Sequence, residues 1–155
     1  MSLEDDLYKE IILENYKSRK NRMRLEGADL HEEGANPSCG DDLELFLQTD
    51  GERVVDAKYD GVGCSICCAS ANLLCDSFRG RSIKEVKGLI EQYRKMITEG
   101  EEPDFPDELE DLEAMQGVKQ YPVRIKCALL AWTTAENMVN EAYPEPAPDT
   151  APDEN

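Results

Sequence analysis

Histidine and basic residues are scarce in this sequence of 155 residues, which holds one histidine and 17 lysines and arginines against 34 acidic residues. The resulting net charge of -17 repels the phosphates of nucleic acids and the anionic surfaces of membranes. We therefore expect no nucleic-acid partner and no membrane partner. The acidic surface instead favours a basic protein partner or cations, and charge alone does not choose between them.

Long hydrophobic runs are also absent. No stretch of about 18 apolar residues occurs, and the opening MSLEDDLYKE has neither the basic nor the apolar region of an export signal. These two absences predict a soluble, cytoplasmic protein. In such a reducing compartment, the six cysteines favour metal ligation or thiol chemistry over a disulfide framework.

The first half of the chain shows a helical pattern followed by a hairpin pattern. Apolar residues at helical spacing predict an amphipathic helix up to about Lys20. Residues 27–36 gather Gly, Asp and Asn and are interpreted as a loop that leads into a tight turn holding Cys39. Alternating apolar residues on both sides of Asp50-Gly51 predict a β-hairpin.

The second half is predominantly helical. A buried helix is expected just after Cys64, ending before Gly80, and Ser82 with Glu85 forms a capping box for the next helix. A linker, a short helix and a last helix over about 124–141 follow. These elements predict an α/β (α+β) fold, a compact sandwich in which helices cover an antiparallel sheet of three strands. We expect one domain over residues 1–142 and a disordered, acidic, proline-rich tail over 143–155.

Three cysteines lie at the edges of these expected elements. Cys39 lies in the turn, Cys64 at a strand-to-helix junction and Cys127 near a helix start. Their long separations do not match a zinc-finger pattern, so by spacing alone each is explained equally well as a small buried hydrophobe. Asp41 follows Cys39 by two residues, and Gly40 between them allows both side chains to turn toward one cation. The alternative for Asp41 is that it only caps the turn.

A thiol redox function is a rival interpretation. Cys64 and Cys67 form a C-x-x-C pair at an expected helix N-terminus, where a thiolate is stabilised. A thioredoxin-like protein places this motif in a βαβ unit, whereas here it follows a hairpin. Cys68 and Cys75 are interpreted as small side chains in the core of the buried helix.

Three motifs together carry a resemblance to a known family. They are NPSCGD at residues 36–41, GVGCSI at 61–66 with Ala69-Ser70 after it, and PVRIKCA at 122–128. In this order they resemble the SufU/IscU iron–sulfur assembly family, also called NifU N-terminal-like, over roughly residues 5–140. Additional residues around 99–113 make the chain more similar to the SufU branch. Near the end of the first helix, Asn15 stands where family members usually carry a histidine.

The resemblance implies a metal site formed by Cys39, Asp41, Cys64 and Cys127. Zn²⁺ is the expected metal, and iron or an Fe–S cluster is the alternative. IscU-like members have a histidine directly before the last cysteine, but Lys126 stands there and its ammonium is unsuited to ligation. The histidine at position 31 lies among acidic residues and is expected to be exposed, so Asp41 is the better fourth ligand.

The resemblance also implies a function in sulfur transfer. A SufU-like protein would accept persulfide sulfur from a pyridoxal-phosphate cysteine desulfurase (SufS-like), with Cys39 freed from zinc by ligand exchange to act as the acceptor. Downstream Fe–S assembly proteins would be further partners. Arg124 is expected to stabilise the sulfur anion or the docked partner, or is an ordinary arginine at a helix start. The alternatives are a scaffold on which a cluster is built and an adaptor with structural zinc.

Overall fold

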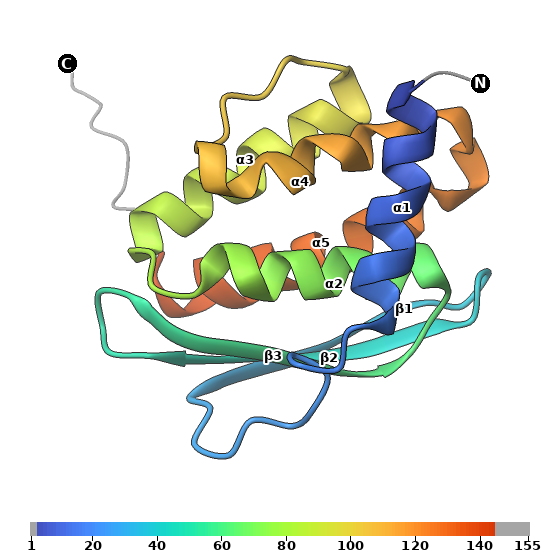
Figure 1. Cartoon of the computed structure of the whole chain (residues 1–155). Coiled ribbons are helices and arrows are strands. Elements are labelled where there is room, and N and C mark those ends of the chain that lie inside the picture. Colours follow the sequence, from blue (N-terminus) through green and yellow to red (C-terminus); the bar gives the residue numbers. More distant parts are fainter. Residues whose placement is uncertain (1–2, 145–155) are drawn as a thin grey trace, which may run out of the picture.

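The structure of the protein is a computed structural model that describes residues 3–144. Figure 1 shows the layers: a three-stranded sheet, helices packed on one of its faces, and further helices beyond them, with the first helix crossing the second. This arrangement confirms the predicted α+β sandwich. In chain order the elements are α1 (Leu3–Lys17), β1 (Leu30–Asn36), β2 (Asp41–Thr49), β3 (Val54–Val62), α2 (Ser65–Phe78), α3 (Ile83–Glu99), η1 (Asp107–Leu109), α4 (Glu110–Ala114), η2 (Met115–Gln120), η3 (Pro122–Arg124) and α5 (Ile125–Ala142).

The sheet is antiparallel and runs in the order β1-β2-β3. The predicted hairpin is confirmed as β2 and β3, and Gly51 in its connection has a φ of 97°, which favours glycine. Leu45 pairs with Tyr59 across the hairpin, and both side chains are fully buried. The face that carries these residues packs against α2 and α5 and forms the centre of the core.

The interpretation of residues 27–36 as a loop is wrong, because Leu30–Asn36 form the edge strand β1. This strand pairs with β2 from Leu30 opposite Leu47 to Asn36 opposite Asp41. Its sequence LHEEGAN is polar and has little intrinsic preference for a strand, so its pairing with β2 decides its conformation. Gly34 permits close packing of α5, since a Cβ there would lie 2.1 Å from Thr134 Oγ1.

Helix α1 ends at Lys17, three residues before the predicted end, because the chain then turns toward α2. Buried amides make this connection: Asn21 Nδ2 donates to Asn72 Oδ1 at 2.9 Å, and Asn72 Nδ2 donates to Asn15 Oδ1 at 2.7 Å. Hydrogen bonding is what makes such polar burial tolerable. Asn15, at the position where the family usually has histidine, therefore holds α1 against α2.

The predicted helix boundaries around α2 and α3 are confirmed. Cys64 is the N-cap of α2, and Gly80 follows its end with a φ of 85°. Ser82 and Glu85 form the expected capping box of α3, and Gly100 ends that helix in the left-handed conformation. These devices are local, which is why the sequence reveals them.

The chain after α5 returns to the sheet at Tyr143, whose hydroxyl lies 2.7 Å from Thr49 Oγ1. The predicted disordered tail lies outside the described residues from position 145 onward. Among the helices of residues 3–144, none is long and apolar enough to cross a membrane.

Candidate metal and sulfur site

The turn between β1 and β2 positions the first two candidate ligands. The Cys39 N–H donates to the Asn36 carbonyl at 3.0 Å, and Gly40 has a φ of 76°, so the chain reverses directly into β2. The Asn36 side chain then donates to Asp41 Oδ2 at 3.3 Å and to the Lys126 carbonyl at 3.1 Å. Asn36 thereby joins the turn to the start of α5. This positioning role, at the first residue of the NPSCGD motif, was not predicted from the sequence.

Asp41 is a carboxylate buried inside the fold, with 1% of its surface exposed. Its Oδ1 accepts a hydrogen bond from the backbone N–H of Cys64 at 3.0 Å, and its Oδ2 accepts the one from Asn36. Neither donor carries a charge. Burying a carboxylate is costly unless a positive charge compensates it, so this environment favours a bound cation.

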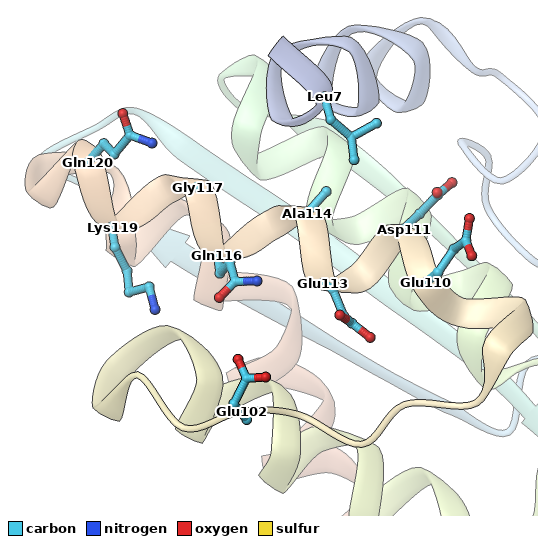
Figure 2. A pocket seen from close by; sticks show the side chains of 10 residues that line it. All are labelled: Leu7, Glu102, Glu110, Asp111, Glu113, Ala114, Gln116, Gly117, Lys119 and Gln120. Atoms are coloured by element: carbon cyan, nitrogen blue, oxygen red, sulfur yellow. The ribbon is translucent and has the colours of Figure 1, made fainter. Parts of the chain in front are cut away.

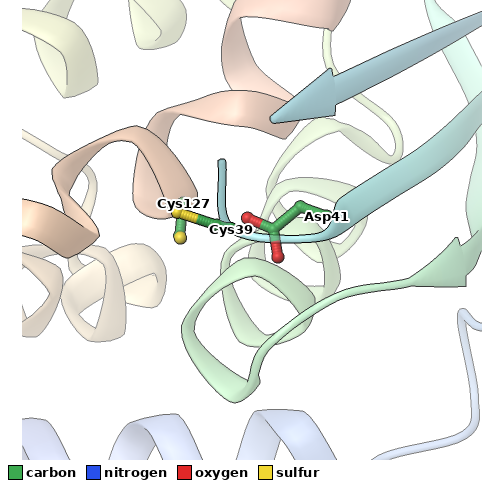
Figure 3. A group of neighbouring side chains, drawn as sticks. All are labelled: Cys39, Asp41 and Cys127. Atoms are coloured by element: carbon green, nitrogen blue, oxygen red, sulfur yellow. The ribbon is translucent and has the colours of Figure 1, made fainter. Parts of the chain in front are cut away.

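Asp41 is one of a trio of residues whose potential ligand atoms lie close together. One ligand atom from each of Cys39, Asp41 and Cys127 lies within 4.8 Å of the other two. Figure 3 shows the three side chains gathered between the β1–β2 turn and α5. Cys64 is outside this trio, but its backbone N–H donates to Asp41 Oδ1, which places it beside the group. The fold therefore brings all four sequence-predicted ligands to one place.

The raised pKa of the Cys127 thiol indicates that this site favours a positive charge. Burial raises the pKa of its thiol well above the usual value, and hydrogen bonds with Asp41, Cys64 and Cys39 raise it further. Its thiolate is disfavoured while negative groups surround it, and a cation would reverse that preference. Three sulfurs and one carboxylate are donors that fit tetrahedral Zn²⁺.

The strand-to-helix junction lets Cys64 approach Asp41. Gly63 precedes Cys64, and a Cβ at Gly63 would lie 3.0 Å from Cys67 Sγ and 3.2 Å from Asp41 Oδ1. A larger residue would force these groups apart. At the other side, Ser70 Oγ donates to the Ala128 carbonyl at 2.7 Å, which holds α2 against α5 directly beside Cys127.

The remaining cysteines, Cys67, Cys68 and Cys75, are all buried in α2. Burial raises the pKa of each of these thiols, and the charge of Asp41 adds to the effect at Cys67. A reactive C-x-x-C pair relies on a lowered thiol pKa. In such a pair the lowered pKa belongs to the attacking first cysteine, so the raised pKa of Cys67, the second cysteine, does not decide the redox interpretation.

Arg124 is a basic residue near the sulfurs. It ends η3, and its interaction with Cys127, and then with Cys64 and Cys39, raises the pKa of its guanidinium. Lys126 is exposed. His31 is exposed on β1 as expected, and its Nδ1 lies 3.2 Å from Glu44 Oε2, in a contact separate from the site.

Replacing Asp41 with alanine is expected to speed metal release to a chelator by about ten- to a hundredfold while the chain stays folded, because one of the four predicted ligands is lost. A colorimetric chelator assay measures the rate. Asp42→Ala is the matched control, since Asp42 is the next residue of β2 and is exposed. Equal release rates for the two variants would remove Asp41 from the ligand set.

A separate hollow of about 600 Å³ lies between α1 and the α4–η2 segment. Figure 2 shows the acidic side chains of Glu102, Glu110, Asp111 and Glu113 in its lining, together with Lys119 and two glutamines. Its lining residues include no cysteine and no histidine. The hollow lies along the region that lengthens this chain before its last cysteine, and it takes no part in the metal site.

Fold and site together define a class: a small α+β protein that gathers cysteine thiols and one buried carboxylate at the end of its sheet, a set of donors suited to a metal ion. The family model of the NifU-like N terminal domain matches residues 7–128. The chain belongs to this family.

Named relatives are found in both branches of the family. The chain is 38% identical to the zinc-dependent sulfurtransferase SufU of Bacillus subtilis, over 87% of this chain and 90% of that protein. It is 39% identical to the iron-sulfur cluster assembly scaffold protein IscU of Thermotoga maritima, over 87% and 94% of the two chains. The crystal structure of a putative SUF-system scaffold protein from Fervidobacterium islandicum superposes with a TM-score of 0.78 at 32% identity, covering 86% and 97%.

Proposed function

We propose that this chain is a cytoplasmic iron–sulfur cluster assembly protein that binds zinc and accepts persulfide sulfur from a SufS-like, pyridoxal-phosphate cysteine desulfurase. The observation that carries the proposal is the cluster of Cys39, Asp41 and Cys127, with the positive charge of Arg124 acting on the same sulfur group. The name of the Bacillus subtilis relative, a zinc-dependent sulfurtransferase, supports it.

Cys39, Asp41, Cys64 and Cys127 would hold the zinc ion. Bound zinc keeps the sulfurs deprotonated at neutral pH, which would overcome the raised pKa of the Cys127 thiol. The protein's own contribution is to hold the ligands: Asn36 and the Cys64 N–H orient the carboxylate of Asp41. Such hydrogen bonds around a ligand tune metal affinity.

Cys39 is the proposed acceptor because it is half-buried on a turn, whereas Cys127 is fully buried on a helix. Its thiolate attacks the outer sulfur of the desulfurase persulfide. A new S–S bond forms on Cys39, the S–S bond of the donor breaks, and the electron pair leaves with the desulfurase thiolate. The positive charge of Arg124, which interacts with Cys127, Cys64 and Cys39, would stabilise the anionic sulfurs during this exchange.

A second candidate function is a scaffold on which an Fe–S cluster is assembled, with iron and sulfide as cargo. Three cysteines in contact are suitable ligands for a cluster, and the Thermotoga maritima relative is named as a scaffold protein. A site that holds zinc only as a structural element is the third possibility considered. Structural zinc sites are closed, whereas Cys39 and Cys64 are partly exposed here.

A measurement of desulfurase turnover distinguishes the sulfur acceptor, the cluster scaffold and the structural zinc site. The zinc-loaded chain is expected to accelerate cysteine consumption by a SufS-like desulfurase, and mass spectrometry should find one added sulfur atom on Cys39. The same chain stripped of zinc is the control and should do neither. Cluster formation without any acceleration would favour the scaffold, and no effect of either kind would favour structural zinc.

A further inference from the structure

Two thiols of the candidate site lie close to each other. The Sγ atoms of Cys39 and Cys127 lie within 4.8 Å, and Figure 3 shows both side chains beside Asp41. Both cysteines are free in the structure. A disulfide bond places its two sulfurs about 2 Å apart, so a small movement of one side chain closes the remaining gap.

Cys39 and Cys127 differ in what can reach them. Cys39 is partly exposed on the turn between β1 and β2, so an external sulfur donor reaches it and its side chain has room to move. Cys127 is fully buried near the start of α5, so only a neighbouring group inside the site reaches its sulfur. Among the cysteines that the structure describes, Cys127 is the one grouped with Cys39 in the trio around Asp41.

We infer that Cys127 releases the sulfur accepted by Cys39 as hydrogen sulfide, by forming a Cys39–Cys127 disulfide. A persulfide on Cys39 has an inner sulfur, the original Sγ, and an outer sulfur that arrives from the exposed side. The inner sulfur is therefore the one that lies beside Cys127. This inference rests on the proposed sulfur-acceptor function and adds the step that unloads the sulfur.

The atoms and electrons of this step balance within the chain. The sulfur of Cys127 attacks the inner sulfur, the new S–S bond forms, and the bond between the inner and outer sulfurs breaks. Its electron pair leaves with the outer sulfur, which departs as hydrogen sulfide with the thiol proton of Cys127. The outer sulfur is reduced and the two cysteines are oxidised to the disulfide. Hydrosulfide is a weaker base than an ordinary thiolate, so it is the better leaving group.

The disulfide also changes the metal site. It would use two of the four predicted ligands, so zinc should leave the chain together with the sulfide. A dithiol reductant would then restore both thiols and allow another round.

The test follows one turnover without any added thiol. The zinc-loaded chain receives sulfur from a SufS-like desulfurase, and in a second arm the zinc-free chain receives it from free glutathione persulfide. The donor is removed, and sulfide and zinc are measured over time. We expect about one sulfide for each persulfide lost, with zinc released in parallel in the first arm. Peptide mapping under non-reducing conditions should find Cys39 joined to Cys127.

The variant Cys127→Ser removes the attacking sulfur and is loaded with glutathione persulfide. It should keep the persulfide and release sulfide at least about tenfold more slowly than the zinc-free wild type, because the intramolecular attack is lost. The matched control is Cys67→Ala, which shortens another buried cysteine outside the predicted ligand set and should release sulfide at the wild-type rate. The peptide map of the wild-type chain decides the inference even where Cys127→Ser folds poorly.

The two sulfur donors keep the outcomes distinct. A loaded chain that keeps its persulfide, equal release by Cys127→Ser and wild type, or a disulfide that joins Cys64 to Cys39 or Cys67 would each overturn the inference. A chain that takes sulfur from glutathione persulfide but not from the desulfurase would overturn the proposed function while the inference is still tested. A chain that takes sulfur from neither donor would overturn both.

Discussion

Alanine at Cys39, Cys64 or Cys127 is expected to reduce the stimulation of a cysteine desulfurase to background. Each change removes a sulfur from the group that surrounds Asp41, and Cys39→Ala also removes the proposed acceptor. Residues that act as one unit lose function together, so single substitutions should be nearly as damaging as a triple one. The measurement is the rate of cysteine consumption with each purified variant, together with its zinc content.

Cys67→Ala, Cys68→Ala and Cys75→Ala are the controls for this experiment. These cysteines are buried in α2, and shortening one should cost about 1 kcal/mol of stability without removing a ligand. We expect these variants to retain most of the stimulation. If Cys67→Ala were as inactive as Cys64→Ala while still binding zinc, a C-x-x-C redox pair would explain the protein better than a sulfur acceptor.

Removal of zinc is expected to lower the melting temperature by roughly 10 °C without unfolding the chain at room temperature. A ligand present at about a thousand times its dissociation constant stabilises the native state by about 4 kcal/mol, and each kcal/mol shifts the melting temperature of a chain this size by about 2–4 °C. The core beneath the site, including Trp132 stacked on Tyr93, does not depend on the metal. Thermal melts before and after chelation, and after zinc is restored, give the measurement.

Two results would contradict this expectation. Elemental analysis should find about one zinc per chain after reducing purification, so metal-free protein with reactive Cys39, Cys64 and Cys127 would end the shared-site proposal. The Cys127→Ala variant is the control, because its melting temperature should respond little to added zinc. An equal response in wild type and Cys127→Ala would place the stabilising metal elsewhere.

Local signals allowed much of the helical structure to be predicted from the sequence. The Ser82–Glu85 capping box and the glycines after α2 and α3 act within a few residues of the helix ends, so their effect does not depend on the rest of the fold. The hairpin around Gly51 is predictable for the same reason. The family motifs named the four candidate ligands, but their spacing alone left each with a structural alternative.

Tertiary contacts decided what the local pattern does not encode. The polar segment Leu30–Asn36 is a strand only because β2 supplies its hydrogen-bond partners, and Asn15 is a buried anchor only because α2 lies beside it. Tyr8 reads in the sequence as one more apolar position of an amphipathic helix. The structure packs its ring against Gly117 and Tyr121, more than a hundred residues later in the chain. Contacts between residues so distant in the chain depend on the packing of the whole fold, which sequence periodicity does not record.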